Sequence, residues 1–280
     1  MTEHDAPVMT RLLLRSCAYT TGMWVVYVLL NTVLNGHVWD GMTVSKSALT
    51  VEYCEFNDVH KFFHQSMNTY SNLVYFFFGV LVCQVARNDA RHQGLGIKNR
   101  LQQFPTLSML TGICFIYLSV GSAFFHASLT WTGQRVDMNG TYGISIVLLC
   151  VAAYHVFYNI TFSDEIKPWI MGILVGLILS FYQIHLLLSS SVLLPAFILS
   201  TWLLIGINYI QFRKERSVLL AISSLALILI ALKIRALDVQ KIDCDPHSPY
   251  QGHSVWHLLA GLSSFCSYAF FRFTPSSKRT

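Results

Sequence analysis

The sequence predicts an all-α integral membrane protein, a bundle of seven transmembrane helices preceded by one extra hydrophobic helix. Hydrophobic residues make up 54% of the 280 residues and charged residues only 12%, about half the share that is usual in soluble domains. The mean hydropathy is +0.49. Runs of about 20 apolar residues, the length that crosses a bilayer core, recur along the chain with short connections between them. We therefore expect one membrane domain and no separate soluble domain.

The seven core helices are expected where these apolar runs occur. The predicted spans are 66–86, 106–128, 138–158, 168–188, 192–211, 217–234 and 253–272. Pro105 and Pro168 mark the starts of two spans, and Pro195 is expected in the first turn of a third, where its missing N–H costs little. No internal repeat is visible along the chain.

An additional apolar run over 17–35 precedes the core. Arg11 and Arg15 come before it, as basic residues do in a signal peptide. The run is long for a signal peptide, and "LNG" before His37 is a poor cleavage site, so we favour a retained helix. The predicted organisation is an N-terminal extension (1–44), a seven-helix domain (45–272) and a cytosolic tail (273–280).

Basic residues predict how the bundle is oriented. They gather in 87–105, in 212–216 and after 271, which all fall on one side if the seven spans alternate. The positive-inside rule places that side and the C-terminus in the cytosol, and 45–65, 129–137 and 235–252 on the opposite face. We interpret the net charge of +5 as that of the basic residues which orient the bundle in the membrane. Nucleic-acid binding is disfavoured, because no dense basic stripe alternates with aromatic residues.

Five polar side chains collect on the non-cytosolic face of this topology. Ser122 and His126 end the second span, Asp137 opens the third, and His253 and His257 open the seventh. Ser122 and His126 are four residues apart and share a helix face. His253 and His257 have the same spacing, which lets two imidazoles converge on one ion. Ionisable groups inside a bilayer are costly, so their combination favours a functional site.

Three histidines that leave a fourth position open are typical of a catalytic zinc site. Zinc lowers the pKa of a bound water to about 7. Asp137 could then take the proton or orient a ligand, and Ser122 could donate a hydrogen bond to a developing oxyanion. The alternative for a single polar residue, such as His155 or His185, is a hydrogen bond across helices.

The stretch "TVEYCEFND" (50–58) precedes the first core span and is rich in oxygen ligands. Its polar residues, with those that follow, are Glu52, Glu55, Asn57, Asp58, Gln65 and Asn68. Such side chains suit a hard cation such as calcium. The alternative is a solvated acidic loop next to the membrane.

Cys54 and Cys244 are the cysteines expected in non-cytosolic connections, whereas the other five lie in apolar spans. Two thiols that face an oxidising compartment can form a disulfide. The alternative is a pair of free thiols.

At these residues the sequence resembles the alkaline ceramidase family, within a superfamily of seven-span membrane hydrolases that includes the adiponectin and progestin receptors. The resemblance rests on "EYCEFN" (52–57), "NTYSN" (68–72), "GSAFFHASL" (121–129) with the later Asp137, and "HSVWHLLAG" (253–261). It implies seven transmembrane helices around an intramembrane zinc ion. His126, His253 and His257 would bind the zinc, and Ser122 and Asp137 would complete the catalytic set.

The implied activity is zinc-dependent hydrolysis of the amide of ceramide to sphingosine and a fatty acid. Asp137 would act as general base and acid, and Ser122 would help to hold the oxyanion. Some family members also bind calcium near the zinc. Carried over, the calcium ligands would be Glu52, the carbonyl of Tyr53, Glu55, Asn57 and Gln65.

The segment before the first core span departs from the family pattern. The family usually begins Asp-Trp-Cys-Glu, whereas this chain has Glu52-Tyr53-Cys54-Glu55. Gln65 stands where a glutamate is expected, and a neutral amide weakens the field on calcium. The extension before residue 45, with its extra helix, is also unlike the smallest family members.

Alternative functions are a superfamily hydrolase of another lipid amide or ester, and a zinc-containing seven-transmembrane receptor for a lipid or hormone. A transporter is disfavoured, because the polar cluster lies near one face and the chain has no repeat. The expected partners are a ceramide-like lipid and the bilayer, with no obligate protein partner. The expected location is an endomembrane (ER or Golgi) or the plasma membrane, with the site on the non-cytosolic face.

Overall fold

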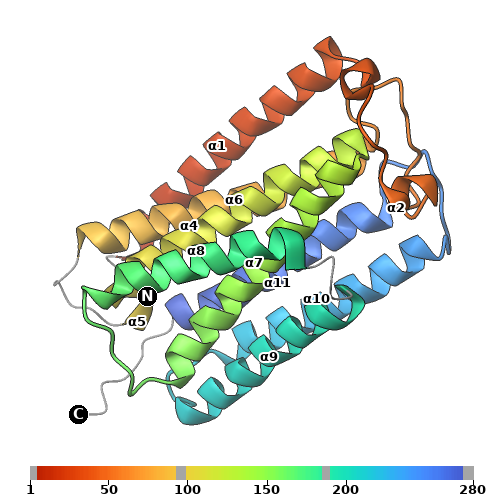
Figure 1. Ribbon diagram of the computed structural model, residues 1–280. Helices are drawn as coiled ribbons and strands as arrows, with labels where there is room; N and C mark the ends of the chain where they lie inside the picture. Colours follow the sequence, from red (N-terminus) through yellow and green to blue (C-terminus); the bar gives the residue numbers. More distant parts are fainter. Residues whose placement is uncertain (1–4, 93–98, 185–189, 274–280) are drawn as a thin grey trace.

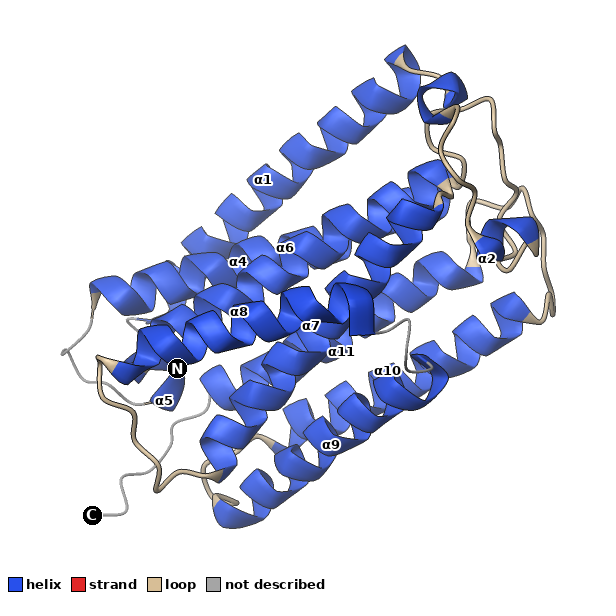
Figure 2. Cartoon of the chain, in the orientation of Figure 1, coloured by secondary structure: helices blue, strands red, loops and turns tan. Residues whose placement is uncertain are grey.

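The computed structural model describes residues 5–92, 99–184 and 190–273, and over these residues the chain is a helical bundle without strands (Figures 1 and 2). The long helices are α1 (Asp5–Val33), α4 (Leu73–Arg91), α6 (Pro105–Ser128), α7 (Trp131–Val156), α8 (Ile166–Ile184), α9 (Ser190–Gln211), α10 (Val218–Val239) and α11 (Gly252–Arg272). The short ones are the 3₁₀ turn η1 (Gly36–Trp39), α2 (Lys46–Leu49), α3 (Ser66–Ser71) and α5 (Arg100–Gln103). His185 and residues 274–280 of the predicted tail lie outside the described residues.

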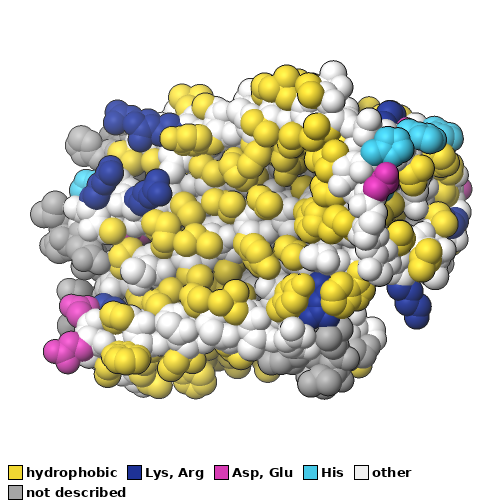
Figure 3. Space-filling view, turned by 45° about the horizontal axis from the view of Figure 1, so that its top comes forward, with side chains coloured by type: hydrophobic (Ala, Val, Ile, Leu, Met, Phe, Trp, Pro, Cys, Tyr) yellow, Lys and Arg dark blue, Asp and Glu magenta, His cyan; other side chains and the backbone are white. Residues whose placement is uncertain are grey.

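The described part of the chain contains seven helical segments that are long and apolar enough to cross a membrane. They are α1, the segment made of α3 and α4, and α6 to α10. The last long helix, α11, has serines and two histidines among its 21 residues and lies against α3, α4, α7 and α10. Hydrophobic side chains cover the middle of the face in Figure 3, and most charged ones lie at its two ends. The predicted multi-pass, all-helical membrane bundle is confirmed, although α11, which corresponds to the predicted span 253–272, is not among the seven apolar segments.

Helix α6 packs closely against α4 and α7 because small residues lie between them. A Cβ atom on Gly112 of α6 would come within 2.5 Å of the Cys83 Sγ in α4. A Cβ on Gly140 of α7 would come within 2.8 Å of the Leu118 Cα in α6. Small residues allow backbones to approach in this way in membranes. The close packing sets where the C-terminal end of α6 and the N-terminal turns of α7 lie relative to each other.

Two predicted boundaries are wrong at the ends of helices that carry polar turns. Helix α7 begins at Trp131 instead of 138, and the Thr130 side chain accepts a hydrogen bond from the Gly133 N–H at its start. Helix α10 continues to Val239 instead of ending at 234, so Arg235 and Asp238 are helical. Polar side chains lower the local hydropathy but do not interrupt the backbone hydrogen bonds of a helix. A prediction from apolar residues alone therefore starts α7 too late and ends α10 too early.

The first core span was predicted to end at 86, whereas α4 continues to Arg91. The first core span is interrupted at Asn72, which separates α3 from α4. Helix α9 begins at Ser190 instead of 192, so Pro195 lies in its second turn and not in the first.

The extra N-terminal helix α1 begins at Asp5, earlier than the predicted 17, and packs along α4. The Gln84 side chain in α4 donates a hydrogen bond to the Ser16 hydroxyl in α1 over 2.8 Å. Near the other end of α1, the Asn31 side-chain oxygen accepts the backbone N–H of Phe63 over 2.9 Å. A helix that supplies partners to buried groups of the core is expected to be retained and not cleaved.

Replacing Asn31 with alanine is expected to lower the Tm of the purified protein. The Phe63 residue is 3% exposed, and loss of its acceptor leaves a buried N–H unsatisfied at a cost of about 1–3 kcal/mol. Thr32→Ala is the matched control, because the exposed Thr32 hydroxyl bonds only to Val28 of its own helix. Thermal unfolding in detergent compares the two variants. An Asn31→Ala protein as stable as the wild type, or an intact mass that lacks α1, would contradict the retained helix.

Candidate metal centre

Three histidines that are distant in the sequence meet at one end of the bundle. His126 lies in the last turn of α6, and His253 and His257 lie in the first two turns of α11. Their possible ligand atoms all lie within 4.8 Å of one another, and the three side chains are 0, 4 and 3% exposed. Within the described ranges, no other group of three or more His, Cys, Asp or Glu side chains is arranged in this way.

Neighbouring hydrogen bonds orient two of these rings. The Nδ1 atom of His126 lies 2.7 Å from the side-chain oxygen of Gln65, which can only accept. The Nδ1 atom of His257 lies 2.7 Å from the Ser71 hydroxyl, and that hydroxyl donates its proton to the Asn68 carbonyl. Both Nδ1 atoms therefore carry the hydrogen, and both Nε2 atoms keep a lone pair. Metal-binding histidines are typically held through the other ring nitrogen in this manner.

The remaining ring nitrogens satisfy a further condition for metal binding. The Nε2 atom of His126 and the Nδ1 atom of His253 are buried and have no hydrogen-bond partner among the described residues. Two buried ring nitrogens without partners in one cluster are costly unless a bound group satisfies them. Three imidazoles that can each offer a nitrogen within 4.8 Å of the others suit zinc, so the donor set fits this metal.

Ser122 and Asp137 lie beside the triad. Ser122 is 2% exposed and lies one turn before His126 on α6. Its side chain faces that of Asp137, in the second turn of α7, and favours the charged form of this carboxylate. The ring of Tyr53 covers the cluster from the loop side, with its centroid 3.9 Å from that of His253. The structure thus brings together all five polar residues that the sequence analysis singled out.

Asp238 connects α10, α11 and the loop before α3. One carboxylate oxygen accepts the His253 N–H and the other accepts the Cys54 N–H, each over 3.2 Å. A Cβ atom on Gly252 would come within 2.9 Å of the Asp238 side chain, so glycine is needed at this position. The carboxylate also lies at the N-terminus of α11, where a negative charge is favourable. Cys54 is joined to Cys244 by a disulfide.

Glu55 lies at the N-terminus of α3. Its carboxylate accepts the backbone N–H groups of Met67 and Asn68, over 2.6 and 2.8 Å. Burial raises the pKa of Glu55 to about 7, and these two hydrogen bonds oppose the rise. Glu52 forms an ion pair with Arg235 of α10 over 3.2 Å. Both carboxylates therefore already have partners within the protein.

Three residues near the histidines were not predicted to belong to the site, namely Asp238, Arg235 and Ser71. Arg235 and Asp238 were assigned to a connection, although an acidic residue directly after an apolar run is a recognisable signal for a buried carboxylate. Ser71 lies within the "NTYSN" block, but only the fold shows that it faces His257.

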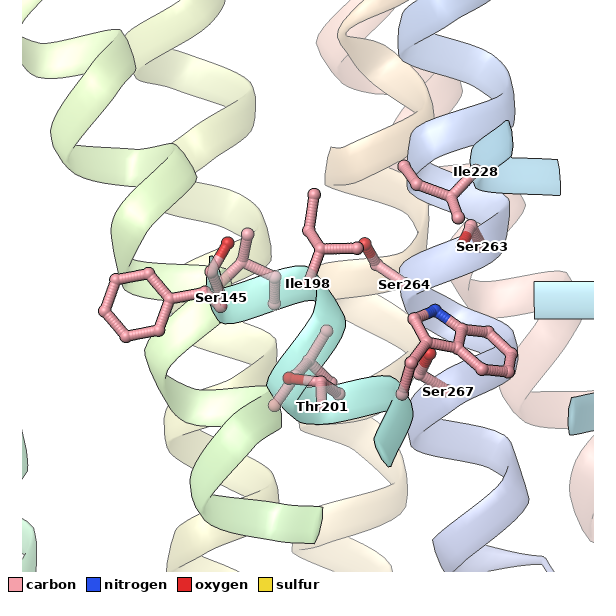
Figure 4. A pocket seen from close by; sticks show the side chains of 11 residues that line it. Ser145, Ile198, Thr201, Ile228, Ser263, Ser264 and Ser267 are labelled. Atoms are coloured by element: carbon pink, nitrogen blue, oxygen red, sulfur yellow. The ribbon is translucent and has the colours of Figure 1, made fainter. Parts of the chain in front are cut away.

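A pocket lies deeper in the bundle, between α7, α9, α10 and α11 (Figure 4). It is lined by five hydroxyl-bearing and six apolar side chains, among them Thr201, Ser263 and Ser267. Ser263 and Ser267 follow His257 by six and ten residues on α11, which corresponds to about 9 and 15 Å along the helix. The pocket therefore begins more than one helical turn below the histidines.

The sequence was compared with known protein families, curated proteins and solved structures. A family model described as Ceramidase matches residues 45–280, a stretch that contains the three histidines, Ser122 and Asp137. No curated protein and no solved structure gives a significant match. Because the family match spans most of the chain, including the three histidines, the chain belongs to the ceramidase family.

Proposed function

We propose that this protein is a membrane-embedded zinc amidase that hydrolyses the N-acyl bond of ceramide to a sphingoid base and a fatty acid. The family match supports a ceramidase-type hydrolase. The observation that carries the finer proposal is the buried cluster of three histidines with unpartnered ring nitrogens, next to the Ser122–Asp137 pair.

His126, His253 and His257 would hold the zinc ion and leave one position open. When bound, zinc supplies a water of lowered pKa and polarises a carbonyl group. The hydrogen bonds that His126 and His257 donate to Gln65 and Ser71 fix two of the three rings before any metal arrives. Preorganised ligands of this kind lose little further freedom on binding.

Asp137 and Ser122 have complementary roles in the proposed reaction. Water adds to the amide carbon, and Asp137 takes the proton that this water releases. The C–N bond then breaks, and Asp137 returns the proton to the departing nitrogen, so that the amine and the acid are the products. The Ser122 hydroxyl donates a hydrogen bond to the carbonyl oxygen, on which negative charge develops.

The pocket below the histidines is suited to a lipid chain. With the amide at the triad, one chain of the substrate would run along α7 and α11 into the space lined by Thr201, Ser263 and Ser267. The hydroxyl groups of Ser263 and Ser267 are hydrogen-bonded to Ser224. Because these groups are paired with one another, the pocket can accept an apolar chain.

The disulfide supports the proposed orientation in the membrane. Cys54 and Cys244 lie at the end of the bundle that holds the histidines, and disulfides persist in oxidising compartments. Basic residues at the opposite end include Arg91 at the end of α4, Arg100 at the start of α5, and Arg213 after α9. The site would then open to a lumen or the cell exterior, and the C-terminus would lie in the cytosol.

Purified protein is expected to contain about one zinc ion per chain and to release sphingoid base from a panel of ceramides. Asp137→Asn is expected to retain zinc but to lower kcat by about 10²–10⁴-fold, because it removes the proton acceptor. His253→Ala is expected to lose both zinc and activity. Asp164→Asn is the matched control, since Asp164 is exposed, precedes α8 and pairs with Lys167 in the first turn of that helix. Metal analysis and product release are measured on the same preparations.

Different outcomes separate the alternatives. Protein without zinc would refute an amidase of this type, and an active Asp137→Asn variant would refute the role of Asp137 in proton transfer. Zinc together with turnover of other lipid amides or esters, but not of ceramides, would favour a related hydrolase. Zinc without any turnover would favour a receptor.

Thr201→Phe is expected to shorten the preferred acyl chain. Thr201 is 7% exposed and lines the pocket, so a larger side chain fills space that the end of a long chain would occupy. Relative kcat/KM for short-chain and long-chain ceramides is the measurement. Leu203→Phe on the same helix is the control, because Leu203 is 65% exposed on the outside of the bundle. An unchanged chain-length profile in Thr201→Phe would place the acyl chain elsewhere.

A further inference from the structure

Gln65 lies at the centre of a buried hydrogen-bond network beside the metal centre. The side chain is 2% exposed and precedes α3. Its oxygen accepts from His126 over 2.7 Å and from the Asn68 side chain over 3.2 Å. Its nitrogen donates to the Asn57 side-chain oxygen over 2.7 Å. Gln65 therefore joins a proposed zinc ligand to the loop that carries Asn57.

This network uses the chemistry of an amide, which can both accept and donate. A carboxylate at position 65 would place one of its oxygens against the Asn57 oxygen, and two acceptors at that distance repel unless a cation lies between them. In Gln65 the side-chain N–H takes the place of such a cation. Gln65 thus satisfies the Asn57 side-chain oxygen by donating a hydrogen bond to it, and no calcium ion is needed for that purpose.

Two further residues that the resemblance assigns to calcium, Glu55 and Glu52, also have partners within the protein. Both oxygens of Glu55 accept backbone N–H groups at the start of α3. Glu52 is paired with Arg235, which brings a positive charge to the loop. The disulfide and the Asp238 carboxylate hold the same loop at Cys54. Calcium needs several oxygen ligands that are free to turn toward it, so the donor set does not fit calcium.

We propose that the loop over residues 52–65 is built without calcium, and that Gln65 instead acts as a positioning residue that holds the zinc ligand His126. The inference rests on the proposed function, since it takes zinc to bind the three histidines. Gln65 touches neither the substrate nor the reacting atoms. It fixes the ring of His126 so that Nε2 faces the other two histidines, and outer partners of this kind typically contribute 10–100-fold to metal affinity.

The first test uses the unaltered protein, freed of calcium and loaded with zinc. Calcium is added to about 10 mM, tenfold above the weakest class of protein sites, and magnesium at the same concentration is the control. A bound ion would raise the Tm as its concentration increases. We expect the same Tm with both ions and no calcium in metal analysis of the purified protein. A Tm that rises with calcium alone, or stoichiometric calcium in the protein, would overturn the inference.

The second test measures zinc affinity with a competing chelator. Gln65→Leu is expected to lower it by about 10–100-fold, because the His126 Nδ1–H loses its acceptor. Gln65→Glu keeps an acceptor and is expected to restore affinity to within a few-fold of the wild type. Gln134→Leu is the matched control, since the Gln134 side chain donates its hydrogen bond to the Ser47 hydroxyl and not to a histidine. Unchanged zinc affinity in Gln65→Leu would refute the positioning role.

The two tests separate this inference from the proposed function. A wild-type protein that binds no zinc refutes both. A protein that binds zinc and also calcium refutes only the present inference. The calcium titration needs no variant, so it remains decisive even if Gln65→Leu does not fold.

Discussion

Burial of three imidazoles in an apolar bundle imposes the strictest demand on this structure, because each buried ring nitrogen needs a partner. Gln65 and Ser71 each accept one N–H, and both come from the segment around the short helix α3. That segment must therefore lie between α6 and α11. The break at Asn72, which separates α3 from the long helix α4, allows it to do so. Among the described residues, the Nε2 atom of His126 and the Nδ1 atom of His253 remain buried without a hydrogen-bond partner.

The same end of the bundle is held by carboxylates at helix N-termini. Glu55 binds the first N–H groups of α3, and Asp238 binds that of His253 at the start of α11. Each acid thus fixes a helix that carries a residue of the site. The Cys54–Cys244 disulfide links the loop that carries Glu55 to the connection between α10 and α11. Because these partners come from four separate segments, the geometry of the site depends on the whole end of the bundle and not on one motif.

Much of the fold and part of the site could be predicted from local patterns. Apolar runs located the long helices, and the spacing of Ser122 with His126 and of His253 with His257 placed each pair on one helix face. Hydropathy failed at the first turns of α7 and the last turns of α10, where polar side chains point inward. Asp238 was not predicted to be part of the site, because its hydrogen-bond partners Cys54 and His253 lie 184 and 15 residues away along the chain.

The sequence by itself determined where the long apolar helices lie and which residues could take part in chemistry, because hydropathy and helical spacing are local properties of the chain. Only the tertiary structure decided what those residues touch. It placed Gln65 against His126 instead of among open calcium ligands, and it paired Glu52 with Arg235. The direction of a hydrogen bond depends on which groups distant segments bring within about 3 Å, and no local pattern contains that information.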